Sequence, residues 1–227
     1  MSYAHVACVI PAFNAAPTLP AVIAGLRRSL PGSHIAVIDD GSMDGTHAVA
    51  EPIVDATIRF TRNRGKGAAL RAGFRAALDR GSDVVVTIDA DGQHEPAFAP
   101  ALVDALGTAD LAIGARDRRS LAMPAGRRLT NRMSAAAVSR CIGRTVDDAQ
   151  SGYRAVRAAV LPFISPRGDR YEFETEFLIL AGRRGYHIAY VPISTRYPAI
   201  VPSRFRPVRD SARIIGALWR FSVGAER

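Results

Sequence analysis

Short apolar runs alternate with segments of helical periodicity along the first half of the chain. The apolar runs are continuous, which is typical of strands in a parallel sheet that is covered on both faces. Each run is followed by a segment whose apolar residues recur at helical spacing. We therefore expect strands at 5–10, 34–40, 57–61, 83–89 and 110–115, and helices at 18–30, 45–51, 65–81 and 96–107.

This order of elements predicts an α/β fold with one doubly wound, mainly parallel sheet and helices on both faces. The second half is less regular. It predicts helices near 127–140 and at 174–185, a turn at 151–154, a strand at 187–193 and an amphipathic helix at 208–223. Because no linker or repeat interrupts the pattern, we expect a single domain over 1–227, with 1–115 and 116–227 as its two halves.

The expected strands end in polar or glycine-rich loops. In open α/β sheets, ligands bind at the carboxyl ends of the strands. Those ends here are PAFN from Pro11 to Asn14, DDGS at 39–42, NRGK at 63–66 and DADGQ at 89–93. Four such loops on one rim form a candidate binding site.

Asp89 and Asp91 directly follow the apolar run 84–88. The two-residue period of a strand points both carboxylates the same way. Neighbouring carboxylates repel each other, so a cation or a sugar hydroxyl between them would explain the pair. An acidic turn after a strand explains it equally well.

Two further loops carry groups that suit a nucleotide. In VIDDGSMDGT at 37–46, Asp39 is placed to accept a hydrogen bond from a nucleobase imide or a ribose, and Asp44 to cap the next helix. In NRGKGAALRAGF, glycines surround Lys66 where a helix begins, so amides and an ammonium can face one anion such as a diphosphate. The loop matches neither GxxxxGK[ST] nor GxGxxG, so neither an ATPase nor a dinucleotide enzyme is indicated.

Composition indicates the partners and the cellular compartment of the protein but does not indicate its reaction. The 227 residues carry a formal charge of +9, which favours anionic partners such as nucleic acid, a membrane surface or phosphorylated small molecules. Cys8 and Cys141 lie far apart, so a reducing compartment is expected. Without a cleavage signal or an apolar run of membrane-spanning length, the chain is expected to be cytoplasmic, either soluble or peripheral at the membrane.

The loops together carry a family resemblance. PAFNAAPTL, VIDDGSMDGT, NRGKGAALRAGF and IDADGQHEP resemble, in order and spacing, the inverting nucleotide-sugar glycosyltransferases of family two, whose fold is the GT-A domain. The resemblance continues through GARD at 114–117, DAQSGYRA at 148–155, FETEF at 173–177 and VPI at 191–193. It covers nearly the whole chain and looks closest to the dolichyl-phosphate mannose and glucose synthases and their polyprenyl-phosphate relatives.

The resemblance implies a donor site at the first half of the rim. Asp39 would hold the base or ribose, Lys66 would lie near the nucleotide, and Asp91 with Gln93 would hold Mg²⁺ or Mn²⁺ against the diphosphate. Such an ion takes oxygen ligands and offsets the charge on the leaving nucleoside diphosphate. The expected nucleotide-binding set is Pro11, Asn14, Asp39, Asp40, Gly41, Lys66, Asp89, Asp91 and Gln93, of which Asp89, Asp91 and Gln93 are the expected metal ligands.

The acceptor determines which other groups are needed. A phosphate monoester is already largely dianionic at neutral pH, so it needs cations, and Arg116, Arg128 and Arg154 are candidates. A hydroxyl acceptor would need a general base, for which Glu174, Glu176 and Asp148 are candidates, although a salt-bridged helix face explains the glutamates equally well. The expected catalytic set is Asp91, Arg116, Asp148, Arg154 and Glu174.

The sequence leaves the sugar and the role of its tail open. After VPIS the mannose synthases carry an arginine and then Ser-Lys-Leu, where this chain has Pro198 and then Ser203, Arg204 and Phe205. The NRGKG loop favours the glucose-transferring relatives, so both UDP-glucose and GDP-mannose types of donor stay open. The cationic amphipathic stretch 208–223 suits either an anionic bilayer interface or the protein's own core.

Three functional hypotheses follow. The first is a metal-dependent inverting transferase that moves a hexose from a nucleotide sugar to a polyprenyl or dolichyl phosphate, with peripheral membrane contact at the inner face. The second keeps the donor but uses a hydroxylated small molecule or glycan as acceptor. The third, a nucleic-acid-binding protein, is disfavoured because no aromatic platform or helix-turn-helix pattern accompanies the positive charge.

Overall fold

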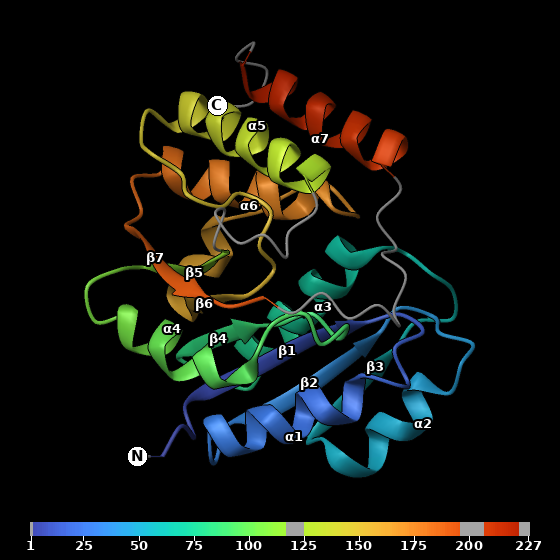
Figure 1. The fold of residues 1–227 in the computed structure, drawn as a ribbon. Coiled ribbons are helices and arrows are strands. Elements are labelled where there is room, and N and C mark those ends of the chain that lie inside the picture. The colour runs from blue at the N-terminus through green and yellow to red at the C-terminus, as the bar shows by residue number, and fades with distance from the viewer. Residues whose placement is uncertain (1, 117–124, 196–206, 223–227) are drawn as a thin grey trace.

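Strands and helices alternate through the first half of the chain and become irregular in the second half (Figure 1). The computed structural model describes residues 2–116, 125–195 and 207–222. The strands are β1 (Val6–Ala12), β2 (His34–Asp39), β3 (Ala56–Arg59), β4 (Val84–Thr87), β5 (Leu111–Arg116), β6 (Arg154–Arg157) and β7 (Ile188–Ile193). The α-helices are α1 (Leu19–Ser29), α2 (Thr46–Ala50), α3 (Lys66–Asp79), α4 (Ala99–Ala105), α5 (Ala125–Ile142), α6 (Glu172–Arg183) and α7 (Pro207–Ser222).

The strands form one sheet in the order β3-β2-β1-β4-β6-β5-β7. Strands β1 to β4 run parallel, as do β5 and β7, whereas β6 is antiparallel to both of its neighbours. The sheet is therefore mainly parallel, and the carboxyl ends of β1, β2, β3 and β4 meet along one edge. This edge carries the loops in which the sequence predicts the site.

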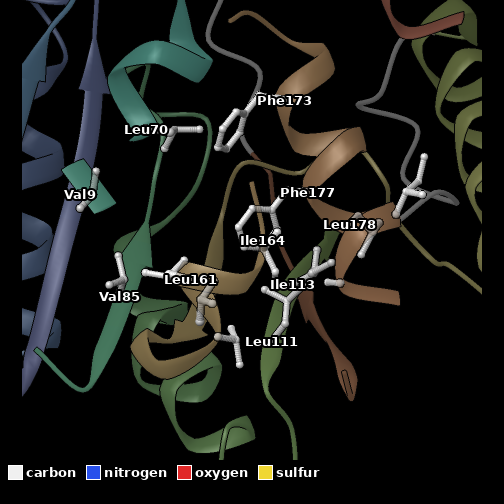
Figure 2. Close-up of a cluster of buried hydrophobic side chains, with 14 of the residues drawn as sticks. Val9, Leu70, Val85, Leu111, Ile113, Leu161, Ile164, Phe173, Phe177 and Leu178 are labelled. Atoms are coloured by element: carbon white, nitrogen blue, oxygen red, sulfur yellow. The ribbon is translucent and has the colours of Figure 1, made fainter. Parts of the chain in front are cut away.

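Alternation along each strand divides the core between the two faces of the sheet. On β1, Ala7 and Val9 belong to one buried cluster, and Val6, Cys8 and Ile10 to the other. The first cluster packs against α3 and α6, with α5 and α7 further out, and the second packs against α1 and α4. Figure 2 shows the first cluster, in which side chains of α3, α6 and the sheet converge. Because both faces are covered, the parallel strands can be apolar throughout.

These findings confirm the predicted α/β class and place the predicted helices and strands within a few residues of their observed bounds. The turn expected at 151–154 is wrong at its last residue, since Arg154 opens β6. That strand has only four residues, RAVR, with an arginine at each end. Pairing with β4 and β5 stabilises this strand, and the RAVR sequence alone does not predict it.

Phe177 on α6 offers a test of this core. Its ring is buried and lies 5.9 Å from the Phe74 ring and 6.1 Å from the Phe173 ring, measured between centroids. Replacing Phe177 with alanine should lower the free energy of unfolding by about 3–5 kcal/mol, because it leaves a cavity that the neighbours fill only partly. Urea unfolding followed by circular dichroism measures this. Phe163→Ala is the control, because Phe163 is exposed, and equal losses in the two variants would contradict the assignment.

Candidate active site

The turn after β2 is braced against the turn after β1. Asp39 is buried, and its Oδ1 accepts a hydrogen bond from the Ser42 amide at 2.9 Å. The Ser42 hydroxyl accepts one from the amide of Asn14 at 2.7 Å, and Asn14 Oδ1 accepts one from the Met43 amide at 2.8 Å. Asn14 has a positive φ of 46°, which asparagine tolerates better than most residues. Asn14 and Asp39, which are expected to bind the nucleotide, therefore lie in two turns that hydrogen bonds hold together. Pro11 lies just before the first turn, within β1.

Asp40 positions the loop that precedes α3. Its two carboxylate oxygens accept hydrogen bonds from the amides of Arg64 and Gly65, at 2.6 and 2.8 Å. Burial raises the pKa of Asp40, and these two bonds oppose that rise. Gly41 makes the approach possible, because it has a φ of +73° and a Cβ there would come within 2.5 Å of the Arg62 carbonyl carbon. Asp40 and Gly41 thus shape the site through the 62–65 loop.

The amides at the start of α3 have a protein partner. The Gly67 and Ala68 amides both donate to the Asp169 carbonyl, at 2.7 and 3.3 Å. The prediction that the first amides of this helix face a diphosphate is wrong for these two. The glycines serve close packing instead, since a Cβ on Gly65 or Gly67 would collide with the backbone at 168–169.

A largely shielded ammonium joins the two halves of the chain. Lys66 Nζ lies 2.5 Å from Asp89 Oδ1, at the end of the β4 segment, and 2.5 Å from Glu174 Oε1 on α6. Burial would lower the pKa of Lys66, but the two carboxylates outweigh burial and raise it. Burial likewise opposes ionisation of Asp89, yet Lys66 holds the pKa of that carboxyl below its ordinary value. Lys66 and Asp89 are therefore charged together.

Gly152, between β6 and the 148–151 loop, lies directly against this ion cluster. A Cβ on Gly152 would come within 2.6 Å of Lys66 Nζ and 2.9 Å of Asp89 Oδ2. Any side chain there would displace the ammonium or the carboxylate. Sequence reasoning treated Gly152 only as part of a turn, and the close approach of distant chain segments explains why the sequence alone did not reveal it.

Asp91 and Gln93 follow Asp89 in a tight turn. The Gln93 amide donates to Asp91 Oδ1 at 2.9 Å, and Gly92 adopts a positive φ of 72°. Within the described residues, no three His, Cys, Asp or Glu side chains form a ready metal cluster. The carboxylates of Asp89 and Asp91 and the side-chain carbonyl of Gln93 offer hard oxygen ligands. Mg²⁺ and Mn²⁺ bind such ligands, usually together with substrate phosphates. The donor set therefore fits such an ion if a diphosphate completes its coordination.

His94 is a buried neighbour of this turn. Its ring packs against the Tyr153 ring with centroids 5.5 Å apart. Burial lowers the pKa of His94 to about 4, although the nearby Asp89 carboxylate opposes this shift. The imidazole is therefore neutral at pH 7, and its packing agrees with a structural position.

Arg116 and Asp148 form a bidentate pair at the end of β5. Arg116 Nε and Nη2 donate to the two carboxylate oxygens at 2.7 and 2.9 Å. The Gln150 and Ser151 amides also donate to Asp148, at 3.0 and 3.1 Å. Burial opposes ionisation, but Arg116 outweighs it and holds the pKa of Asp148 below its ordinary value. This saturated carboxylate is poorly suited to act as a general base.

Arg154 is buried rather than presented to a ligand. Its guanidinium donates to the carbonyls of Ser151, Glu174 and Ala149, at 2.8, 3.1 and 3.3 Å, and lies over the Phe177 ring. Burial lowers its pKa. The expected contact with an acceptor phosphate does not fit this arrangement. Arg154 instead links the 149–151 loop to α6 through these hydrogen bonds.

Glu176 links α6 to two other segments. Its Oε2 accepts hydrogen bonds from the Arg167 and Gly168 amides, both at 2.8 Å, and its Oε1 lies 2.5 Å from Arg220 Nη2 on α7. These contacts favour the structural alternative for Glu176 over the general base. Several residues that entered the sequence argument, Pro198, Ser203, Arg204 and Phe205, lie outside the described residues.

A mainly parallel sheet with Asp39, Asp89, Asp91 and Lys66 along one edge is the arrangement that the sequence led us to expect of a GT-A glycosyltransferase. A family model described as "Glycosyl transferase family 2" matches residues 7–163. The chain therefore belongs to glycosyl transferase family 2 and is an enzyme of that family.

Two relatives are similar along most of their length. The undecaprenyl-phosphate mannosyltransferase of Micrococcus luteus is 35% identical over 202 residues, which cover 84% of this chain and 83% of that protein. The polyprenol monophosphomannose synthase of Mycolicibacterium smegmatis is 36% identical over 204 residues, covering 82% and 75%. Both names describe transfer to a polyprenyl-type lipid.

Solved structures of glucosyl-3-phosphoglycerate synthase from Mycobacterium tuberculosis are similar in fold. A complex with Mg²⁺ and uridine diphosphate gives a TM-score of 0.73 at 25% identity, covering 95% of this chain and 78% of that chain. A complex with Mn²⁺, UDP-glucose and phosphoglyceric acid gives a TM-score of 0.72 at 25% identity, covering 95% and 79%.

The Arg116–Asp148 pair yields a stability prediction. Arg116→Met leaves a buried carboxylate without its guanidinium, which should lower the free energy of unfolding at pH 7 by about 3–5 kcal/mol. Because the folded pKa of Asp148 is depressed, its stabilising contribution is complete at neutral pH and is lost as the pH falls through that pKa, below the ordinary value of about 3.9. Urea unfolding at pH 7 measures the loss.

The double variant Arg116→Met/Asp148→Asn is the control for this pair. It removes the uncompensated charge, so it should recover part of the lost stability. If Arg116→Met alone is as stable as the parent protein, or if the second substitution adds a further loss of the same size, the pair does not have the assigned role.

Proposed function

We propose that this chain transfers a hexose from a nucleotide sugar to a polyprenyl or dolichyl phosphate in a metal-dependent, inverting reaction. An oxygen of the acceptor phosphate attacks the anomeric carbon in line. The bond from that carbon to the nucleoside diphosphate breaks, and its electron pair leaves with the diphosphate. Residues 1–115 would bind the donor and residues 116–227 the acceptor.

The main support for this proposal is that all three candidate general bases already form ion pairs or hydrogen bonds within the protein. Asp148 is held by Arg116, Glu174 by Lys66, and Glu176 by two amides and Arg220. A hydroxyl acceptor would need one of them free to take its proton. A phosphate acceptor needs none, since it is largely ionised at neutral pH. The names of the two relatives support the same acceptor class.

The donor would lie along the strand ends of the first half. Asp39 and the loop held by Asp40 and Gly41 would face the nucleoside, and Asp89, Asp91 and Gln93 would hold Mg²⁺ or Mn²⁺ beside the diphosphate. Bound there, the ion would neutralise charge on the leaving group. The solved complexes of the similar synthase contain Mn²⁺ or Mg²⁺ with a uridine nucleotide, which supports this assignment.

A lipid acceptor requires access to a membrane. No helix among the described residues is long and apolar enough to cross a bilayer. Large apolar side chains nevertheless face solvent on the outer helices, where α5 and α7 lie side by side (Figure 1): Met133 is 65% exposed, Ile215 64% and Trp219 67%. Arg132, Arg140 and Arg220 are exposed on the same two helices. We propose peripheral contact with an anionic bilayer through this surface.

Product extraction tests the acceptor. The protein is incubated with radiolabelled nucleotide sugar, Mn²⁺ and vesicles that contain either polyprenyl phosphate or the matched polyprenol, which ends in a hydroxyl. We expect label in the organic phase only with polyprenyl phosphate. Label that stays in the aqueous phase with every donor, or enters equally with polyprenol, would contradict the proposed acceptor.

A thermal-shift screen tests the donor and the metal. Nucleotide sugars should raise the melting temperature only when Mn²⁺ or Mg²⁺ is present, because a bound ligand stabilises the native state by mass action. Asp91→Ala should abolish the rise. Asp83→Ala is the control, since Asp83 is exposed just before β4, at the opposite end from the site. Equal shifts with and without metal would exclude the assigned role of the Asp91 turn.

A further inference from the structure

The carboxyl end of β2 presents two hydrogen-bond acceptors, Asp39 Oδ2 and the Ser42 carbonyl, both of which face the Arg59 guanidinium. Asp39 Oδ2 is buried and has no hydrogen-bond partner, because Oδ1 is the oxygen that receives the Ser42 amide. A buried acceptor without a donor is costly and rare in a folded protein. The carbonyl of Ser42 lies next to it, at the turn that Asn14 and Asp39 hold in place. This pair of acceptors indicates a ligand with hydrogen-bond donors.

Arg59, at the end of β3, shows which donors the pair can receive. Its Nε lies 3.4 Å from Asp39 Oδ2, and its Nη2 donates to the Ser42 carbonyl, also at 3.4 Å. Both distances exceed those of well-formed N–H···O bonds, so the guanidinium covers the acceptors without satisfying them. Its side chain is 54% exposed and can swing into solvent. Two parallel N–H groups of one planar unit therefore fit these acceptors.

Among the common nucleobases, guanine has this donor pattern. Its N1–H and N2–H bonds are adjacent and parallel and belong to a planar unit that repeats the arrangement of nitrogens in a guanidinium. Uracil offers one N–H between two carbonyls, and a carbonyl facing the Ser42 oxygen would repel it. Adenine and cytosine each offer an amino group beside an acceptor nitrogen. A site with two fixed acceptors discriminates against bases that cannot pair with both.

We propose that Asp39 Oδ2 and the Ser42 carbonyl select a guanine nucleotide, and that Arg59 covers these acceptors until the base displaces it. The inference rests on the proposed function, since it assigns the nucleoside of the same donor. It concerns the base alone and holds for either lipid or hydroxyl acceptors. The sequence pattern indicated base contact for Asp39, whereas the parts of Ser42 and Arg59 follow from the geometry of the two turns.

Calorimetric titration of the full chain with GDP, UDP and IDP in the presence of Mn²⁺ tests the proposal. The three ligands carry the same charge, so their affinity ratios isolate the base. We expect GDP to bind at least about tenfold more tightly than UDP, because UDP leaves an acceptor unpaired. IDP keeps N1–H but lacks the amino group, and it should fall between them.

Two variants separate the acceptors from the residue that covers them. Asp39→Asn keeps an oxygen for the Ser42 amide but turns Oδ2 into a donor, so the preference for GDP should vanish or invert. Arg59→Met removes the competing guanidinium, so the ratio of GDP to UDP affinity should be retained. Arg28→Met, an exposed position at the end of α1, controls for the loss of one positive charge.

Each outcome decides the proposal. Tighter binding of UDP than GDP, equal binding of GDP and IDP, or loss of the GDP preference in Arg59→Met would overturn it. Metal-dependent binding of UDP alone would overturn the choice of guanine and leave the proposed transferase function standing. Failure of every nucleotide to bind in the presence of metal would overturn both.

Discussion

The ion cluster of Lys66, Asp89 and Glu174 is the interaction on which the candidate site depends. Taking three charged groups out of water is expensive, and their attraction offsets that cost only if the geometry is good. Both contacts of the ammonium are short, and Gly152 is the residue that leaves room for them. Because Lys66 begins α3 and Glu174 lies on α6, the cluster fixes these two helices relative to the strand end that carries Asp89.

Other contacts in the same region serve that placement. Arg154 fastens the 149–151 loop to α6 through backbone carbonyls, and Asp40 holds the loop that leads to Lys66. Several charged residues near the rim therefore act on backbone groups. The count of 30 lysines and arginines therefore overstates the number of cationic groups that are available to contact an anionic ligand. Arg116 illustrates this, since its guanidinium is paired with Asp148.

The sequence predicted the features that are local to one segment. Continuous apolar runs indicated β1, β2 and β4, and polar strand ends indicated the rim with Asp39 and Asp89, because both follow from the periodicity of a strand and the direction of a parallel sheet. The sequence did not predict β6, the engagement of the α3 amides by Asp169, or the partners of Arg154. Each of these depends on contacts between segments far apart in the chain, for which one sequence provides no pattern.

Charge balance connects the cluster to the chemistry. Lys66 faces the carboxylates of Asp89 and Glu174, and Asp91 adds a further carboxylate at the same strand end. An anionic diphosphate would be repelled from this edge unless a cation accompanied it. Under the proposed function, a divalent ion would bring positive charge to these carboxylates, and the diphosphate would supply the oxygen ligands that the protein does not. In the proposed reaction, the carboxylates at the end of β4 would make donor binding depend on metal binding.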